Sequence, residues 1–208
     1  MALFGIDTGT GGGKFLPIIK HDARAGRYNL RDKVDGVARE TPIKDFKAVF
    51  DLANIDVGWM HFAAGQAPSY VMVPNGTSPG PKPTADHQSG FRLRMKLGKE
   101  WGGDVREFTS SSKLAVAAVD KLHTAFVNAA ESKQGKLPVI AVGESQPIKS
   151  QGQQGATNYQ PQFSIVGWVD RPSDLVAPEG VSQAVTNDGP PSTGSTVVSA
   201  TSADDDFG

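Results

Sequence analysis

The sequence contains no cysteine among its 208 residues. That absence excludes disulfide scaffolds, thiol nucleophiles and cysteine-ligated zinc sites. No apolar run approaches the roughly 18 residues of a membrane-spanning helix. The first residues have neither the basic nor the apolar region of a secretory signal peptide. We therefore expect a cytoplasmic protein that does not associate with a membrane.

Glycine and proline, in contrast, are abundant, with 24 and 14 residues, together about 18% of the chain. An average protein has roughly 12%. This composition disfavours a helix bundle and favours strands joined by turns. Residues 1–13 and 175–208 hold too little apolar surface to offset the entropy of ordering them. We expect a flexible leader and a disordered acidic tail there.

The formal net charge of −1 hides an uneven distribution. Residues 177–208 contain five acidic residues and no lysine or arginine, which leaves 21 basic and 17 acidic residues in 1–176. A mildly basic body is therefore joined to an acidic end. A basic body is compatible with a nucleic-acid partner.

Apolar periodicity predicts strands through most of the chain and one helix. The helix begins at Ser111 or Ser112 and ends before Gly135. Its apolar stripe is Leu114, Ala118, Leu122, Phe126 and Ala129. The predicted strands are 15–20, 27–31, 46–52, 55–59, 70–73, 91–97, 137–142 and 163–169.

This order, several strands, one helix and two further strands, is typical of the OB fold. We expect a mainly β domain over residues 14–174: an OB-like five-stranded barrel with one helix between its third and fourth strands. Another small barrel, or an α+β sandwich with one helix, stays open as an alternative.

The clearest strand pattern carries cations. Arg92, Arg94 and Lys96 alternate with apolar residues, which places them about 7 Å apart on one face. Lys99 and Trp101 follow in a glycine-rich loop. Cations with aromatic platforms bind single-stranded nucleic acid. Charges that only protect a solvated edge strand are the alternative interpretation.

A second group of cations surrounds the first strands. Lys20, Arg24 and Arg27 lie there with Tyr28. We predict that these cations also contact phosphates and that Tyr28, like Trp101, stacks on bases. Trp59 and Trp168 lie in apolar alternation, so we expect both to pack in the core.

No set of residues supports catalysis. The four histidines have no metal-ligand spacing, and an enzyme that uses Asp7 is the least favoured class. We predict a protein that is not an enzyme and binds no metal or cofactor.

The last residues combine acidic groups with an aromatic ring: Asp204, Asp205, Asp206 and Phe207. Carboxylates can meet a basic rim while the ring fills an apolar pocket of a partner protein. We predict a partner-binding element here. A purely solubilising tail is the alternative.

This plan of an OB-like core, a polar leash and an acidic aromatic tip resembles phage-type and bacterial single-stranded DNA-binding proteins. The resemblance implies a protein that coats single-stranded DNA in replication, recombination and repair. It also implies that the tip recruits replication or recombination proteins and competes with DNA for the basic groove. A virion structural or assembly protein with a small β-domain and an RNA-binding OB module stay open, as does assembly into a homo-oligomer.

Overall fold

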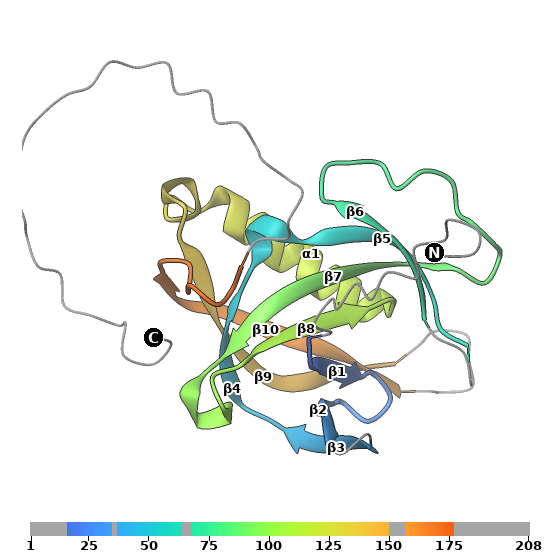
Figure 1. The fold of residues 1–208 in the computed structure, drawn as a ribbon, viewed down its shortest axis with the longest axis horizontal. Coiled ribbons are helices and arrows are strands. Elements are labelled where there is room, and N and C mark those ends of the chain that lie inside the picture. Colours follow the sequence, from blue (N-terminus) through green and yellow to red (C-terminus); the bar gives the residue numbers. More distant parts are fainter. Residues whose placement is uncertain (1–15, 35–36, 64–67, 150–156, 177–208) are drawn as a thin grey trace, which may run out of the picture.

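The computed structural model describes residues 16–34, 37–63, 68–149 and 157–176, which fold into ten β-strands and one α-helix (Figure 1). The mainly β fold with one α-helix is therefore confirmed for this part of the chain. Three short 3-10 helices cover Leu52–Asn54, Lys99–Trp101 and Ser132–Gln134. The longer elements are β1 Ile18–Asp22, β2 Arg27–Val34, β3 Val37–Ile43, β4 Phe46–Phe50, β5 Asp56–His61, β6 Ser69–Pro74, β7 Gln88–Leu97, β8 Val105–Ser110, α1 Lys113–Asn128, β9 Leu137–Lys149 and β10 Thr157–Val169.

The ten strands belong to one sheet, whose main path runs β10-β9-β4-β7-β8-β1-β2-β3. Neighbours on this path pair antiparallel, except that β1 runs parallel to β8. Strand β5 pairs with the first half of β7 and carries β6 on its other side. Because the path ends at β10 and at β3, the described sheet is open, and the predicted five-stranded barrel is not confirmed.

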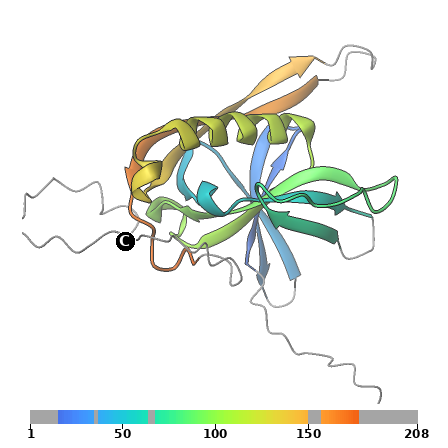
Figure 2. The same cartoon turned by 90° about the horizontal axis from the view of Figure 1, so that it is seen from above.

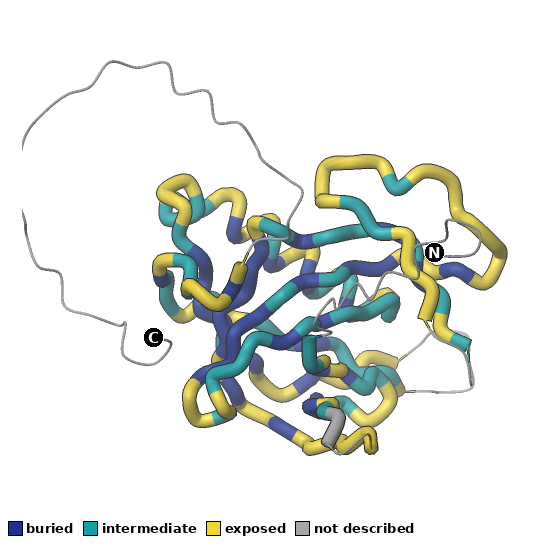
Figure 3. The backbone as a smooth tube through the Cα atoms, viewed as in Figure 1, coloured by how far each residue is buried: buried dark blue, intermediate teal, exposed yellow. Residues whose placement is uncertain are grey.

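The position of the helix corrects the predicted strand count. Helix α1 follows the eighth of the described strands, not the third. Two additions cause the difference: the β1–β2–β3 meander precedes β4, and the β5–β6 hairpin is inserted between β4 and β7. Six of the seven residues of β3 are exposed (Figure 3). A strand exposed on both faces has no apolar alternation, so the sequence pattern did not reveal it.

Interlocking aromatic rings form the centre of the core. The Phe108 ring lies edge-to-face against Phe91 and Phe163, with centroids 5.2 and 6.4 Å apart. Phe163 in turn meets Phe50 at 5.6 Å. Edge-to-face pairs of this kind contribute about 0.5–1.5 kcal/mol each beyond their buried area. Strands β4, β7, β8 and β10 are therefore held together by one aromatic cluster.

Helix α1 covers this core and packs on β10 (Figure 2). It buries Ala115, Val119, Leu122 and Phe126. The predicted stripe is thus correct at Leu122 and Phe126 and one residue too early at Leu114 and Ala118, while Ala129 follows the helix and is half-buried. Trp168 stacks on Phe126 with centroids 6.1 Å apart, which confirms its predicted core role. No helix in the described ranges is long and apolar enough to cross a membrane.

The β1–β2 turn bridges toward the far end of the sheet. The Tyr159 N–H of β10 donates to the Ala23 carbonyl over 2.7 Å. The Tyr159 ring also packs against Gly26, whose φ of +68° favours glycine and where a Cβ would lie 2.7 Å from the ring. His21 Nε2 and the Ser145 hydroxyl are 3.0 Å apart. These contacts tie β1 to the β9–β10 hairpin without a strand ladder.

The residues after β10 remain part of the folded domain. Leu175 is fully buried in a second apolar cluster, which it forms with Val49, Leu137, Val139 and Val169. The folded part therefore extends past the domain boundary predicted at residue 174. The predicted leader at 1–13 and the residues from 177 onward lie outside the described ranges.

Candidate nucleic-acid interface

The three cations of β7, hereafter the β7 cations, project from the strand opposite its buried apolar residues, but each is engaged. Arg92 Nη2 lies 2.7 Å from Asp56 Oδ2. Arg94 Nη1 donates to the Val176 carbonyl over 2.8 Å. Lys96 Nζ lies 3.1 Å from Asp174 Oδ2. Arg92 therefore links β7 to the neighbouring strand β5, and Arg94 and Lys96 hold the C-terminal segment, residues 174–176, against the sheet.

The exposure of these side chains decides which could also reach a ligand. The Lys96 side chain is only 10% exposed, so its predicted role as a phosphate ligand does not fit its burial. The Arg92 side chain is 37% exposed, and Arg94 is half-buried. Both arginine side chains therefore keep part of their surface accessible beside the bonds they make.

An exposed aromatic pair lies at the end of the β5–β6 hairpin. Phe62 is 53% and Tyr70 39% exposed, and their rings meet edge-to-face with centroids 5.9 Å apart. Burial raises the pKa of the Tyr70 phenol, the Glu107 carboxylate raises it further, and Arg92 opposes them. Tyr70 therefore lies within electrostatic range of the β7–β8 surface that carries Arg92.

The sequence pattern does not single out this aromatic pair. Tyr70 opens a short apolar run, and Phe62 follows a strand whose alternate residues face the core. A large ring directly after one apolar strand and another at the start of the next are the signal that could have revealed them. The contact between the two rings depends on the strand register, because the pairing of His61 with Ser69 brings Phe62 and Tyr70 together.

The cations of the β1–β2 hairpin, hereafter the basic turn, are available. Lys20, Arg24 and Arg27 are all exposed, and none takes part in an ion pair with another described residue. Asp22 Oδ1 accepts the N–H groups of Ala25 and Arg24, and these bonds lower the pKa of its carboxyl. The turn is thus fixed by its own backbone, which leaves its basic side chains free for a ligand.

Tyr28 does not belong to the surface. It is 4% exposed and its ring packs against Phe46 at 5.5 Å and His21 at 4.8 Å. No described residue gives its hydroxyl a hydrogen-bond partner, and burial raises the pKa of its phenol. With no exposed ring face, Tyr28 cannot stack on a base of a surface strand, so that prediction is corrected.

Lys99 and Trp101 lie in the short 3-10 helix after β7. Lys99 is exposed, whereas Trp101 is half-buried and packs against the main core. Its ring therefore offers at most one side to a ligand. Trp59 is likewise half-buried, and its indole N–H donates to the Gly80 carbonyl over 3.1 Å. The loop between β6 and β7 is thereby fastened to β5.

The histidines form no metal centre in the described ranges. The His61 and His87 rings are 5.4 Å apart, and His87 Nδ1 lies 2.8 Å from the Thr84 hydroxyl. No group of three or more potential ligands surrounds them or any other described position. The arrangement serves to fix the loop before β7.

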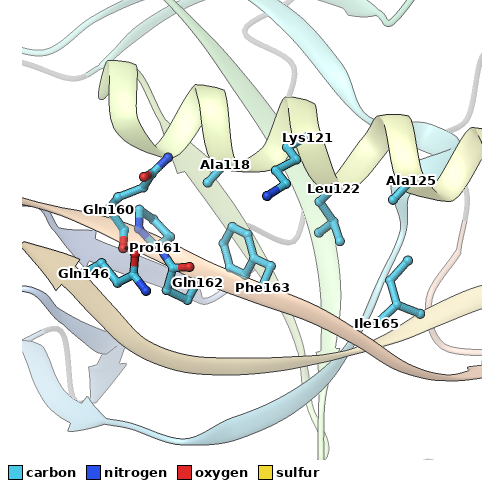
Figure 4. A pocket seen from close by; sticks show the side chains of 10 residues that line it. All are labelled: Ala118, Lys121, Leu122, Ala125, Gln146, Gln160, Pro161, Gln162, Phe163 and Ile165. Atoms are coloured by element: carbon cyan, nitrogen blue, oxygen red, sulfur yellow. Dashed lines mark hydrogen bonds between the residues drawn. The ribbon is translucent and has the colours of Figure 1, made fainter. Parts of the chain in front are cut away.

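A groove of about 390 Å³ separates α1 from β10. Figure 4 shows Lys121 pointing from α1 toward β10, with the Phe163 ring below it. Three amides contribute to the lining, from Gln146, Gln160 and Gln162. Lys121 is the one ionisable side chain among the lining residues, so the groove has no acid–base pair.

Comparison of the chain with protein-family models, with curated proteins and with solved structures finds no match.

Proposed function

We propose that the chain is a single-stranded DNA-binding protein that coats DNA during replication or recombination. The observation that carries this proposal is the exposed Phe62–Tyr70 pair, with the cation Arg92 within electrostatic range of Tyr70. Sequence-tolerant binding of single strands needs aromatic faces for bases and cations for phosphates. A stacked base contributes about 1–3 kcal/mol, so two rings provide a substantial part of a binding free energy.

We further infer an OB-type core inside the larger sheet. Strands β4, β7 and β8 precede α1, and β9 and β10 follow it, which is the order of three strands, a helix and two strands. The pairing order β10-β9-β4-β7-β8 keeps these five together. OB folds bind oligonucleotides on their second and third strands and on the loops after the first and fourth strands.

This assignment gives the two hairpins a role. The β5–β6 hairpin occupies the connection after the first OB strand, and β9–β10 form the hairpin after the fourth. Both extend toward the same side of the molecule in Figures 1 and 2. A strand bound on β7 and β8 would then pass between an aromatic hairpin and the basic turn, with Lys99 as a further phosphate contact.

The acidic tip, residues 204–207, is proposed as the partner-binding element. Asp204, Asp205 and Asp206 would meet a basic rim and Phe207 an apolar pocket on a replication or recombination protein. Deletion of residues 199–208 tests this. The expected result is higher affinity for single-stranded DNA together with loss of partner capture. If the deletion changed neither the affinity for single-stranded DNA nor partner capture, the proposed role of the tip would be contradicted.

Binding itself is tested by fluorescence anisotropy with a labelled oligothymidine at several salt concentrations. Single-stranded DNA releases about 0.7 counterion per neutralised phosphate. The five contacts from Arg92, Arg94 and the three cations of the basic turn therefore predict a slope of log K against log [salt] of about −3.5. Absence of salt-sensitive binding below micromolar concentration would refute the proposal. Tighter binding of an RNA of equal sequence would favour the RNA-binding alternative, and large oligomers without nucleic-acid binding would favour an assembly protein.

A further inference from the structure

The groove between α1 and β10, hereafter the α1–β10 groove, has an apolar floor. Leu122 is buried there, and Phe163 and Ile165 are half-buried and pack against the main core (Figure 4). The volume of about 390 Å³ lies within the range of ligand pockets, about 300–1,000 Å³. The groove can therefore take an aromatic ring together with the short residues beside it.

The rim of the groove offers hydrogen bonds and a positive charge. Gln146 and Gln160 are direct partners in the β9–β10 ladder, and no described residue bonds to either side-chain amide. Lys121 is exposed and forms no ion pair with another described residue. The neighbouring carboxylate, Asp120, lines a different pocket on the side of α1 that faces β5 and β7. The α1–β10 groove therefore matches an extended segment that carries carboxylates and a ring.

The α1–β10 groove lies apart from the candidate DNA-binding surface. Its lining residues come from α1, β9 and β10, whereas the β7 cations project from β7 and the basic turn joins β1 to β2. A segment that occupied the groove would therefore leave those cations uncovered.

The chain itself contains a segment of matching chemistry. Phe207 is the one aromatic residue in the sequence from 177 to 208, and it directly follows three aspartates. Asp204 is 28 positions after Val176, the last described residue. A random coil of that length spans about 30 Å, which is about the diameter of a small domain. The tip can therefore reach the groove from Val176.

We propose that the acidic tip, residues 204–207, docks in the α1–β10 groove of its own chain. Phe207 packs on the apolar floor, a carboxylate of the tip pairs with Lys121, and the two unpaired rim amides bond to the tip backbone. The docked tip is hidden from a partner protein, a consequence that rests on the partner-binding role proposed above. The higher DNA affinity expected after deletion of residues 199–208 then follows from the loss of three negative charges.

The direct test uses the full-length chain with a nitroxide spin label beside the tip. The sequence has no cysteine, so Ser202→Cys creates a single labelling site. Paramagnetic broadening in NMR spectra is expected at the amides of Lys121, Gln160 and Gln162, but not at those of the β7 cations. Uniform broadening, or broadening centred on the β7 cations, would overturn the proposal.

A mixing experiment separates docking within one chain from docking between two copies. The nitroxide-labelled chain is mixed with a ¹⁵N-labelled chain that carries no nitroxide. We expect no broadening in the ¹⁵N spectrum of this mixture. Broadening at the groove amides there would assign the tip to a second copy and overturn docking within one chain.

Variants of two exposed lysines test the contact itself. Lys121→Glu places a carboxylate against those of the tip and should abolish the broadening at Gln160 and Gln162. Lys133→Glu, which reverses an exposed charge outside the groove, is the matched control and should retain it. Phe207→Ala should abolish the broadening as Lys121→Glu does. Broadening that survives both Lys121→Glu and Phe207→Ala would refute the docking.

The docking and the proposed function fail in distinguishable ways. The groove amides report docking of the tip, whereas oligothymidine anisotropy reports DNA binding. A chain that binds oligothymidine without selective broadening in the groove keeps the function and loses the docking. Selective broadening in a chain that binds no oligothymidine keeps the docking and loses the function.

Discussion

Arg171 and Asp51, 120 residues apart in the sequence, form a two-pronged ion pair. Arg171 Nη1 lies 2.6 Å from Asp51 Oδ2, and Nη2 lies 2.8 Å from Oδ1. Asp51 is 1% exposed, and each of its two carboxylate oxygens also accepts a hydrogen bond from Asn54 Nδ2. The pair fastens the C-terminal segment to the end of β4, next to the buried Leu175.

Removal of Arg171 alone should therefore destabilise the fold strongly. Arg171→Leu leaves the Asp51 carboxylate buried without its counter-charge, at a cost of about 3 kcal/mol. The double variant Arg171→Leu/Asp51→Leu should recover part of this loss, because no buried charge remains. Urea unfolding of the wild-type protein and of both variants measures these changes, with the exposed Lys133→Ala as control. A double variant less stable than the single one would show that the carboxylate acts through Asn54 instead.

His21 should make stability depend on pH. Burial lowers the pKa of His21 from 6.5 to about 4, so the unfolded chain binds a proton in this range while the folded protein does not. Stability is then fully present above pH 6.5 and is lost as pH falls toward 4, by about 3 kcal/mol in total. The lowered pKa of Asp22 acts in the same direction, but only below about pH 4.

Thermal unfolding between pH 7 and pH 4 checks this expectation. His21→Gln removes the titrating group and should flatten the profile in that window. His123→Gln, which keeps His21, serves as the control and should retain the slope. A variant His21→Gln with an unchanged slope would assign the pH dependence to other groups.

The exposed aromatic pair gives the most direct functional prediction. Phe62→Ala and Tyr70→Ala should each weaken oligothymidine binding between about five-fold and a hundred-fold, because a stacked base is worth about 1–3 kcal/mol. Thermal stability should change little, since both rings are exposed. Val71→Ala, an exposed residue on the same hairpin, is the control. If Phe62→Ala and Tyr70→Ala bound oligothymidine as tightly as Val71→Ala does, the bases would not stack on this aromatic pair.

Local pattern was sufficient for most of the secondary structure. Alternation over β7 correctly placed Leu93, Met95 and Leu97 in the core, and the helix was found with its buried Leu122 and Phe126. The sequence pattern did not predict strand β3, because almost all of its residues are exposed. It did not predict β8, because Arg106, which is 5% exposed, places a charged residue at an inward-facing position. Its charge is balanced by Asp32 and Asp104 at 2.9 Å each, a compensation that only the folded chain provides.

The candidate interface was less accessible to sequence reasoning. A period of two correctly put the β7 cations on one face, but periodicity carries no information about what covers that face. Here Asp56, Asp174 and the Val176 carbonyl do so, and all three come from distant segments. Tyr28 was misjudged for the same reason, since its burial depends on β4 packing against it.

The ion pairs of β7 lead to opposite expectations for two neighbouring positions. Asp56→Asn removes the charge that neutralises Arg92 and leaves an amide of the same shape. Oligothymidine affinity should then rise about two- to five-fold, because Arg92 no longer has to leave an ion pair worth roughly 0.2–1 kcal/mol when it meets a phosphate. Lys96→Ala removes a buried cation whose partner Asp174 is half-exposed and can be solvated. It should cost about 1 kcal/mol of stability and leave DNA affinity unchanged. Anisotropy titrations in a salt series, paired with urea unfolding, measure both effects. If Lys96→Ala lost as much affinity as Arg24→Ala in the basic turn, the Lys96–Asp174 pair would have to open when the strand binds.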